Sequence, residues 1–347
     1  MAKRRYSWLR TALLFIRCEL NWLKDTLLKI TFMTDRRDFI KQTGILSIAG
    51  IIGTNRIALA EKPIKSFAPK SSKWADGSRL VVSATMLFEA GGQPDNAPSP
   101  FPPNMKPGYK DLPATTWYEY GYKEGIPRML DNWDKLGIKV TSHMVGSAIL
   151  KNPALAKEIV DRGHEASGHG MTWKDEYDMS YAEEKKFIKD GLDAIKKVTG
   201  QTAVGYNANF LRRSENTLNI LQELGCIYHI DDLSRDEPFI IKVNQKDFAV
   251  VPYTIRNNDL GMIELRNFSP DQYITQVKME FDQLYEESAD RRRQLSVTFH
   301  DRVSGTPQMV KAATELITYM QKHRGVAFMR KDEIARMTLE DPTSIRE

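Results

Sequence analysis

Short apolar runs alternate with longer amphipathic stretches from residue 80 almost to the C-terminus. The run Leu80–Phe88 is nearly continuous in apolar and β-branched residues, which predicts a buried strand. Six later runs have a similar composition and predict further strands: Ile138–His143, Ala203–Tyr206, Cys226–Ile230, Phe248–Val251, Leu295–Phe299 and Val326–Met329.

Helix-start signals lie between these runs. Ile126–Leu136 has the spacing of an amphipathic helix, and Ser180–Glu183 forms a capping box before a helix that ends at Gly200. At three more places a polar cap residue is followed by proline at the first helical position: Asn152-Pro153, Ser269-Pro270 and Thr306-Pro307. Strands and helices are therefore expected to alternate.

This alternation predicts an α/β fold, because parallel strands need helical crossovers. Seven or eight units over about 270 residues fit an irregular (β/α)7-8 barrel. An open doubly wound sheet is the alternative, but no glycine-rich phosphate loop follows the first strand. The proline- and glycine-rich segment Ala90–Pro113 interrupts the rhythm and is expected to be either a binding loop or a surface excursion.

The positive charge of the chain is confined to its beginning. Residues 1–60 carry eleven Lys and Arg against four Asp and Glu, a balance of +7, and the remainder carries 39 against 41, a balance of −2. The part expected to fold gives no reason to predict nucleic-acid binding. The triplet Arg291–Arg293 is interpreted as a solvated loop.

The beginning of the chain resembles a twin-arginine export signal. Asp35–Lys41 contains the arginine pair, the short apolar run Gly44–Gly53 follows, and Ala58–Ala60 is a small-x-small cleavage site. The apolar run is too short for a membrane span. We expect export by the twin-arginine machinery to the periplasm or cell envelope, with cleavage after Ala60.

These features predict three parts. Residues 1–60 are an N-terminal extension and signal peptide, with Met33 as the expected start, or with a membrane-surface helix before it. Residues 61–72 are a polar linker, and residues 73–340 are the barrel. Cleavage would leave Cys226 as the remaining cysteine, so no intramolecular disulfide is expected.

Polar side chains stand where most of the predicted strands end, which is where β/α barrels assemble active sites. They are Glu89, His143, His169, Asn207, Asp231, Asp232 and His300. The other histidines have structural interpretations. His164 is five residues from His169 and faces the other side of a strand, His229 is expected in the core, and His323 suits a helix C-terminus.

Several of these residues lie in motifs that resemble the polysaccharide deacetylase family. Leu87–Gly91 resembles its T-F-D-D-G motif, Arg162–His169 its G-H-E-I-x-x-H segment, and Val297–His300 its L-x-L-H motif. The allantoinase-like branch of the family is closer still over four segments: His169–Trp173 (H-G-x-x-W), His300–Pro307 (H-x-R-x-x-G-x-P), Val251–Thr254 (I-P-Y-T) and Asn257–Asp259 (T-N-D). The likeness extends from about Leu80 to Met337.

The resemblance implies a zinc site that these residues do not complete. Metal-dependent members have a second Asp and a second His where this chain has Ala90 and Trp173. Neither side chain ligates zinc by the usual chemistry. Either a different metal site forms around His169, with His143 or Asp231, or the mechanism is metal-free.

The family implies hydrolysis of carbon–nitrogen bonds, and the residues suggest roles. Glu89 is predicted to be the general base, with a pKa raised by desolvation, and His300 the general acid. His169, with or without a metal, would polarise the carbonyl. Substrate binding is predicted at Trp173 as a stacking platform, at Arg212 and Arg302 as charge partners, and at Asp231 and Asp232, which would orient a histidine.

Three functions agree with the sequence. The first is deacetylation of an amino-sugar polysaccharide in the cell envelope. The second is hydrolysis of a small cyclic amide, imide or ureide. The third is a non-catalytic carbohydrate-binding barrel, which the retention of both Glu89 and His300 argues against.

Overall fold

The computed structural model of the protein describes residues 73–94, 97, 99, 105–106 and 108–347. The chain divides into two units, Met1–Lys65 and Ser66–Glu347, and all described residues belong to the second. The predicted signal, the start at Met33, the cleavage site and the linker lie outside the described residues. Among those that are described, no helix is both long and apolar enough to cross a membrane.

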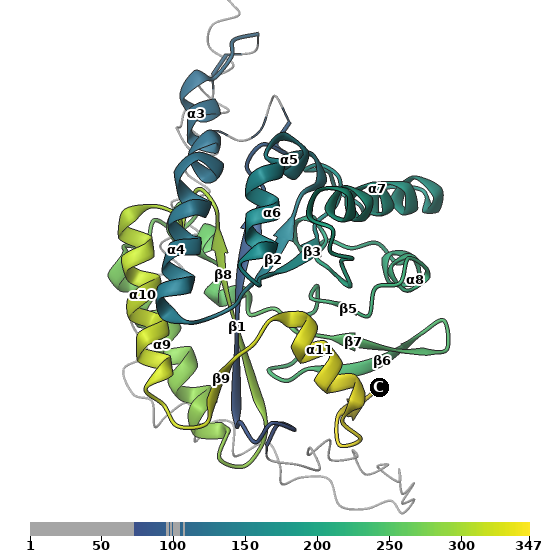
Figure 1. Ribbon diagram of the computed structural model, residues 1–347, viewed down its shortest axis with the longest axis vertical. Helices are drawn as coiled ribbons and strands as arrows, with labels where there is room; N and C mark the ends of the chain where they lie inside the picture. Colours follow the sequence, from purple (N-terminus) through teal and green to yellow (C-terminus); the bar gives the residue numbers. More distant parts are fainter. Residues whose placement is uncertain (1–72, 95–96, 98, 100–104, 107) are drawn as a thin grey trace, which may run out of the picture. The chain divides into compact units, whose positions relative to one another are not determined.

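The second unit is built on a curled sheet of ten strands (Figure 1). The strand order is β10-β6-β7-β5-β4-β3-β2-β1-β8, and β9 pairs with β1 beside this path. The strands are β1 (Leu80–Phe88), β2 (Thr141–Met144), β3 (Glu165–Gly168), β4 (Gly205–Tyr206), β5 (Tyr228–His229), β6 (Phe239–Val243), β7 (Lys246–Val250), β8 (Arg293–His300), β9 (Val326–Phe328) and β10 (Ile345–Arg346).

All pairings in this sheet are parallel except that of β6 with β7. The segment that follows β7 returns to β8: Asn258 forms a parallel bridge with Thr298, and the Ser296 amide donates to Thr254 Oγ1 at 3.2 Å. This segment thereby closes the curled sheet against β8. The predicted irregular α/β barrel is confirmed.

Two strands lie in segments for which the sequence predicted none. β6 forms a hairpin with β7 through Asn244 and Gln245, whose φ angles of 47° and 65° make the tight turn. β10 pairs with β6 and extends the sheet to Arg346, so the expected end of the barrel at residue 340 is too early. A two-residue strand is held by its tertiary partner, and its own pattern is too short to predict it.

Helices cover the outside of the sheet (Figure 1). They are α3 (Leu112–Tyr120), η1 (Gly121–Gly125), α4 (Ile126–Leu136), α5 (Gly146–Lys151), α6 (Pro153–Asp161), α7 (Tyr181–Thr199), η2 (Asn209–Leu211), α8 (Thr217–Glu223), η3 (Ile255–Asn257), η4 (Leu260–Glu264), α9 (Pro270–Glu287), α10 (Pro307–Gln321) and α11 (Lys331–Glu340). The helix predicted from Ile126 is continuous with η1 and α3, so the predicted loop Ala90–Pro113 runs into a helix at Leu112.

The predicted helix starts are largely confirmed. Capping boxes are present at Ser180 and Ser269, where each hydroxyl accepts from the third helical amide. Asn152 and Thr306 precede α6 and α10 as predicted but make no capping hydrogen bond with their side chains. The proline that follows each of them sets the helical φ without that bond.

Candidate active site

Glu89 directly follows β1, and its backbone is fixed by the neighbouring strand β8. The register of the two strands places Leu87 opposite His300. Asp301, the residue after β8, accepts hydrogen bonds from the amides of Glu89 at 2.9 Å and Ala90 at 2.7 Å. The end of β1 therefore cannot move independently of the end of β8.

The three predicted catalytic side chains meet at this mouth of the barrel. Glu89 Oε1 lies 3.2 Å from His169 Nε2 and 3.8 Å from His300 Nε2. All three side chains are buried. On its other side, His169 Nδ1 lies 2.7 Å from the carbonyl oxygen of Asn207, so both nitrogens of this ring face hydrogen-bond acceptors.

His300 is oriented by Asp259, for which no role was predicted from the sequence. The Asp259 carboxylate accepts from His300 Nδ1 at 2.6 Å, from the His300 amide at 2.7 Å and from the Ser304 hydroxyl at 2.6 Å. Burial acts to lower the pKa of His300, but the charges of Asp259 and Glu89 raise it above its usual value. The Asn257–Asp259 motif is the feature of the sequence that could have identified Asp259 as a site residue.

Arg302 adds a buried positive charge to the site. Its Nη1 lies 2.8 Å from Glu89 Oε2 and 3.3 Å from Asp301 Oδ1. Its guanidinium carbon is 4.8 Å from the ring centre of Trp173, 5.2 Å from that of Trp117 and 5.3 Å from that of Tyr118. Aromatic faces attract a guanidinium, so these rings hold the cation beside Glu89.

The pKa of Glu89 differs from the sequence-based expectation. Burial does act to raise it, as predicted, but His300, Arg302 and the hydrogen bond from His169 outweigh burial and hold the pKa well below the usual range. The prediction of a raised pKa is wrong because these cations come from distant segments. Glu89 is therefore an anion at all ordinary pH values.

The side chains at this mouth do not fit the family's zinc triad. The methyl group of Ala90 has no donor atom, and Trp173 Nε1 is itself a hydrogen-bond donor, to the Glu89 carbonyl at 3.2 Å. No group of three histidine, cysteine or acidic side chains within the described part of the chain could hold a metal ion.

The two alternative metal ligands do not complete a site around His169 either, because His143 is deeply buried and Asp231 binds other groups. His143 is buried with its ring centre 6.4 Å from that of His169, and burial followed by the His169 charge keeps its pKa well below the usual value. Asp231 accepts from Asn207 Nδ2 at 2.7 Å and from the Ala208 amide at 3.0 Å. The positive charge at Glu89 comes instead from Arg302.

A pocket of about 420 Å³ opens over these groups. Its lining includes Glu89, His169, Trp173, His300 and Arg302 among the predicted site residues. The rest of the lining is Leu87, Ser99, Trp117, Tyr118, Asn207, Asn209, Phe210, Leu211, Tyr253, Asn258, Leu260, Glu264 and Leu265. A volume of this size fits one ring-sized ligand and its substituents.

Three predicted binding residues, Arg212, Asp231 and Asp232, do not line this pocket. Arg212 is exposed, with its guanidinium carbon 5.9 Å from the Phe210 ring centre. Asp232 accepts from the amide and hydroxyl of Ser234 at 2.8 and 2.6 Å. The Asp231 carboxylate supports the pocket through Asn207, and the histidine ring that Asp231 contacts is His229, whose Nδ1 accepts from the Asp231 amide at 3.2 Å.

The loop after β4 lines the pocket in a strained conformation. Phe210 and Leu211 have φ angles of 51° and 62°, which cost a residue with a side chain about 1–3 kcal/mol each. Three carboxylates hold this loop in place. Asp231 binds its beginning, Glu176 accepts from the Asn209 backbone, and Glu184 accepts from Ser214 at 2.6 Å. Strain that is held this firmly is typical of functional sites.

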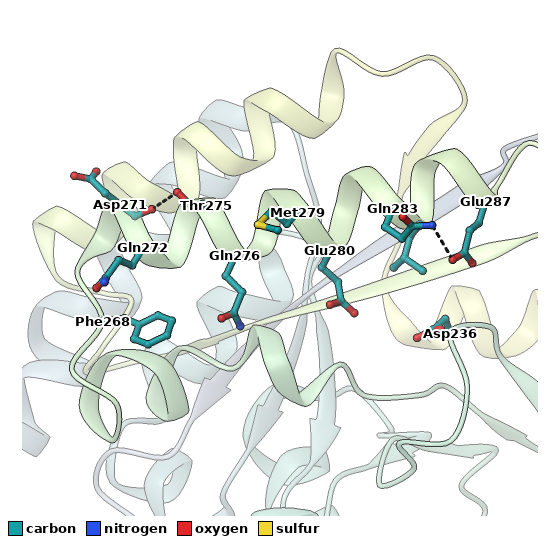
Figure 2. Close-up of a pocket in the computed structure, with 11 residues that line it drawn as sticks. Asp236, Phe268, Asp271, Gln272, Thr275, Gln276, Met279, Glu280, Gln283 and Glu287 are labelled. Carbon is teal, nitrogen blue, oxygen red and sulfur yellow. Dashed lines mark hydrogen bonds between the residues drawn. The ribbon is translucent and has the colours of Figure 1, made fainter. Parts of the chain in front are cut away.

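A second hollow, of about 730 Å³, runs along α9 (Figure 2). One face of α9 lines it, with Phe268 and Asp236 across from the helix. Its polar groups bind one another or nearby arginines: Gln283 donates to Glu287 at 3.2 Å, and Glu280 pairs with Arg256 at 2.6 Å. The described residues that line it include no histidine, so the catalytic chemistry belongs to the first pocket.

Comparisons with known proteins agree with this geometry. A family model described as polysaccharide deacetylase matches residues 110–229. A peptidoglycan deacetylase of Helicobacter pylori is 26% identical over 243 residues, which are 61% of this chain and 82% of that protein.

Two crystal structures share the fold over most of the chain. That of a probable polysaccharide deacetylase from Pseudomonas aeruginosa PAO1 has a TM-score of 0.74 and 28% identity, and covers 79% of this chain and 96% of that one. That of the allantoinase Puue has a TM-score of 0.74 and 25% identity, and covers 85% of this chain and 99% of that one.

The barrel and its site therefore define a hydrolase that acts on carbon–nitrogen bonds. The family model, the relative and the first of these two structures all show that the chain is similar to polysaccharide deacetylases.

Proposed function

We propose that this chain removes acetyl groups from N-acetylated amino sugars of a polysaccharide in the cell envelope. The observation that carries the proposal is the meeting of an anionic Glu89, the His300–Asp259 pair and the Arg302 guanidinium in one pocket. The match to a peptidoglycan deacetylase favours a glycan as the substrate.

The reaction would begin with a water molecule oriented by the Glu89 carboxylate. As the water oxygen attacks the acetyl carbon, Glu89 takes a proton from it, and the carbonyl oxygen gains negative charge. Arg302 and His169 would stabilise that charge, since both lie beside Glu89. The low pKa of Glu89 makes it a weak base, so stabilisation of the developing charge by these two side chains matters more than the proton affinity of Glu89.

His300 would complete the reaction as the general acid. Asp259 fixes its Nδ1, so Nε2 points toward Glu89, and the raised pKa of His300 favours the protonated ring that a general acid needs. This proton passes to the sugar nitrogen as the carbon–nitrogen bond breaks. The products are acetic acid and the free amine, which account for all atoms of the amide and the water, and the proton that Glu89 took from water returns to His300.

Export by the twin-arginine machinery is part of the proposal. Arg36-Arg37, the apolar run after them and the small-x-small site before Glu61 support it. The expected place of action is the periplasm or cell envelope, where a peptidoglycan substrate is accessible. A reporter fused after Ala60 should be exported, and Arg36→Lys with Arg37→Lys should hold it in the cytoplasm.

Acetate release from N-acetylglucosamine oligomers and from peptidoglycan tests the enzymatic proposal. We expect release by the wild-type protein and very little by His300→Ala, with equal thermal stability as the control for folding. Absence of acetate release from every N-acetylated glycan would reject the proposed reaction.

A small cyclic ureide is the second candidate substrate, because two observations favour it. The pocket of about 420 Å³ suits a single ring, and the allantoinase structure matches 85% of this chain. Ring opening of allantoin without acetate release from glycans would establish this alternative.

A further inference from the structure

One acidic side chain in the pocket has no part in the reaction described above. Glu264 lines the pocket from the last position of η4, together with Leu260 from the first position and the following residue, Leu265. Met262, on the same short helix, is 2% exposed and packs in the core. The buried Met262 anchors η4, so Glu264 has a fixed place in the wall of the pocket.

The same element also carries the partner of His300. Asp259 caps η4 by accepting from the Leu260 amide at 2.8 Å, and it binds His300 through Nδ1. Glu264 is therefore held in register with the catalytic histidine, and a group bound by Glu264 would lie at a fixed position relative to the reacting carbonyl.

The other carboxylates in or beside the pocket are already satisfied. Glu89 binds His169 and Arg302, Asp259 binds His300 and Ser304, and Asp301 binds two amides and Arg302. Glu264 is half-buried and makes no side-chain hydrogen bond or ion pair with any described residue. Burial and the Asp259 charge raise its pKa, and Arg302 opposes them.

The Glu264 oxygens accept from no described side chain, so a donor group of a ligand in the pocket would offset the cost of their partial burial. Such an oxygen pair accepts hydrogen bonds and attracts positive charge, so the matching ligand group is an ammonium or another group rich in N–H donors. It also disfavours an anionic substituent at the same place. Asn207, Asn209 and Asn258 in the pocket lining add neutral polar groups that suit sugar hydroxyls.

We propose that Glu264 forms a subsite for a protonated amine of the substrate, so that the enzyme prefers glycans already carrying a free amino sugar next to the acetylated one. This proposal rests on the proposed deacetylase function and names the substrate class of the same pocket. A preference of this kind would favour deacetylation of successive sugars, because the product of one reaction carries the group that Glu264 binds.

The test compares two N-acetylglucosamine tetramers, one fully acetylated and one with a single free amine beside an acetylated sugar. We expect wild-type kcat/KM to be about fivefold higher for the amine-bearing tetramer, as for one partly shielded ion pair. Glu264→Gln should abolish this preference through KM. Higher salt should reduce the preference in the wild type, since salt screens a partly exposed pair.

Glu286→Gln is the matched control, because Glu286 is an exposed glutamate on α9 that does not line the pocket. It should keep the wild-type preference. An equal preference in wild type and Glu264→Gln, or a wild-type preference for the fully acetylated tetramer, would overturn the proposal.

Binding separates this proposal from the proposed reaction. Calorimetry with Glu89→Gln should show tighter binding of glucosamine than of N-acetylglucosamine, and the added Glu264→Gln change should remove the difference. If this holds while the wild type releases no acetate, the subsite stands and the reaction fails. If Glu264→Gln instead weakens binding of allantoin and not of glucosamine, the carboxylate serves ureide N–H groups and the amine assignment is overturned.

Discussion

The two faces of strand β1 differ sharply in what they contact. Leu80, Val82, Met86 and Phe88 face outward and belong to one apolar cluster that also contains side chains of α4, α9 and α10. Figure 1 shows these three helices along the side of the sheet formed by β1 and β8. Each large side chain buried there contributes about 1.5–3 kcal/mol to folding.

The inward face is polar over much of its length. Ser83 and Thr85 alternate with the apolar residues of β1, and the same line ends at Glu89. Neighbouring strands add further buried polar groups. Glu165 accepts from the Thr141 hydroxyl at 2.7 Å, and Lys331 donates to the Ser296 hydroxyl at 3.0 Å.

These interior groups show how strongly burial alters proton affinity. Burial raises the pKa of Glu165 to about 7, and burial lowers the pKa of Lys331 to about 7. The outer face therefore supplies the stability, and the inner face supplies a low-dielectric setting in which charges act strongly on one another. Mutations on the two faces should separate stability from activity.

Glu89→Gln should have the largest effect, on the inner side. We expect kcat for acetate release to fall on the order of 10³-fold, because the neutral amide cannot take a proton from water. Circular dichroism should show a folded protein, and Glu286→Gln serves as the control for activity. Activity within tenfold of the wild type would remove Glu89 from the role of base.

Met86→Ala tests the outer face. Met86 is fully buried, so its truncation should lower the free energy of unfolding by about 3 kcal/mol. Urea denaturation measures this change, and kcat at low temperature should stay close to that of the wild type. A large loss of kcat without loss of stability would contradict the division between the faces.

Asp259→Asn should have a smaller effect on rate and a distinct effect on pH dependence. The general acid His300 must be protonated, so kcat/KM falls as pH rises through its pKa, which Asp259 raises. Removing the Asp259 charge lowers that pKa and should move the alkaline limb to lower pH, with a loss on the order of 10²-fold. A profile with an unmoved alkaline limb would show that another group is the acid.

Chelation should have the smallest effect. The positions of Ala90 and Trp173 provide no metal-binding atoms, and Arg302 supplies the positive charge beside Glu89. Dialysis against a chelator should change kcat by less than about twofold. Activity that is lost on dialysis and restored by Zn²⁺ would require a metal site built from other residues.

The sequence alone predicted the scaffold well because its signals are local. The apolar run Leu80–Phe88 coincides with β1, and the capping boxes at Ser180 and Ser269 begin α7 and α9. Periodicity and capping act over a few residues, so a single segment carries them. The two-residue strand β10 carries no such pattern and was missed.

The active site was predictable only in part, because many of the contacts that form it join residues far apart in the sequence. Residues at strand ends share one mouth of a parallel barrel, which is why Glu89, His169 and His300 were expected together. The aromatic rings around Arg302 come from α3 and from the segment after β3, and no spacing in the sequence links them. Arg212 and Asp232 have suitable chemistry, but the backbone turns them away from the pocket.

The order of strands and helices, the polar residues at strand ends and the incomplete metal motif are properties of the sequence itself. The tertiary structure alone decided the charge state of the site. It placed Asp259 beside His300, which raises the pKa of His300. It also placed Arg302 beside Glu89, which lowers the pKa of Glu89. Electrostatic interactions depend on distances through space in a buried medium, and the order of residues along the chain does not contain those distances.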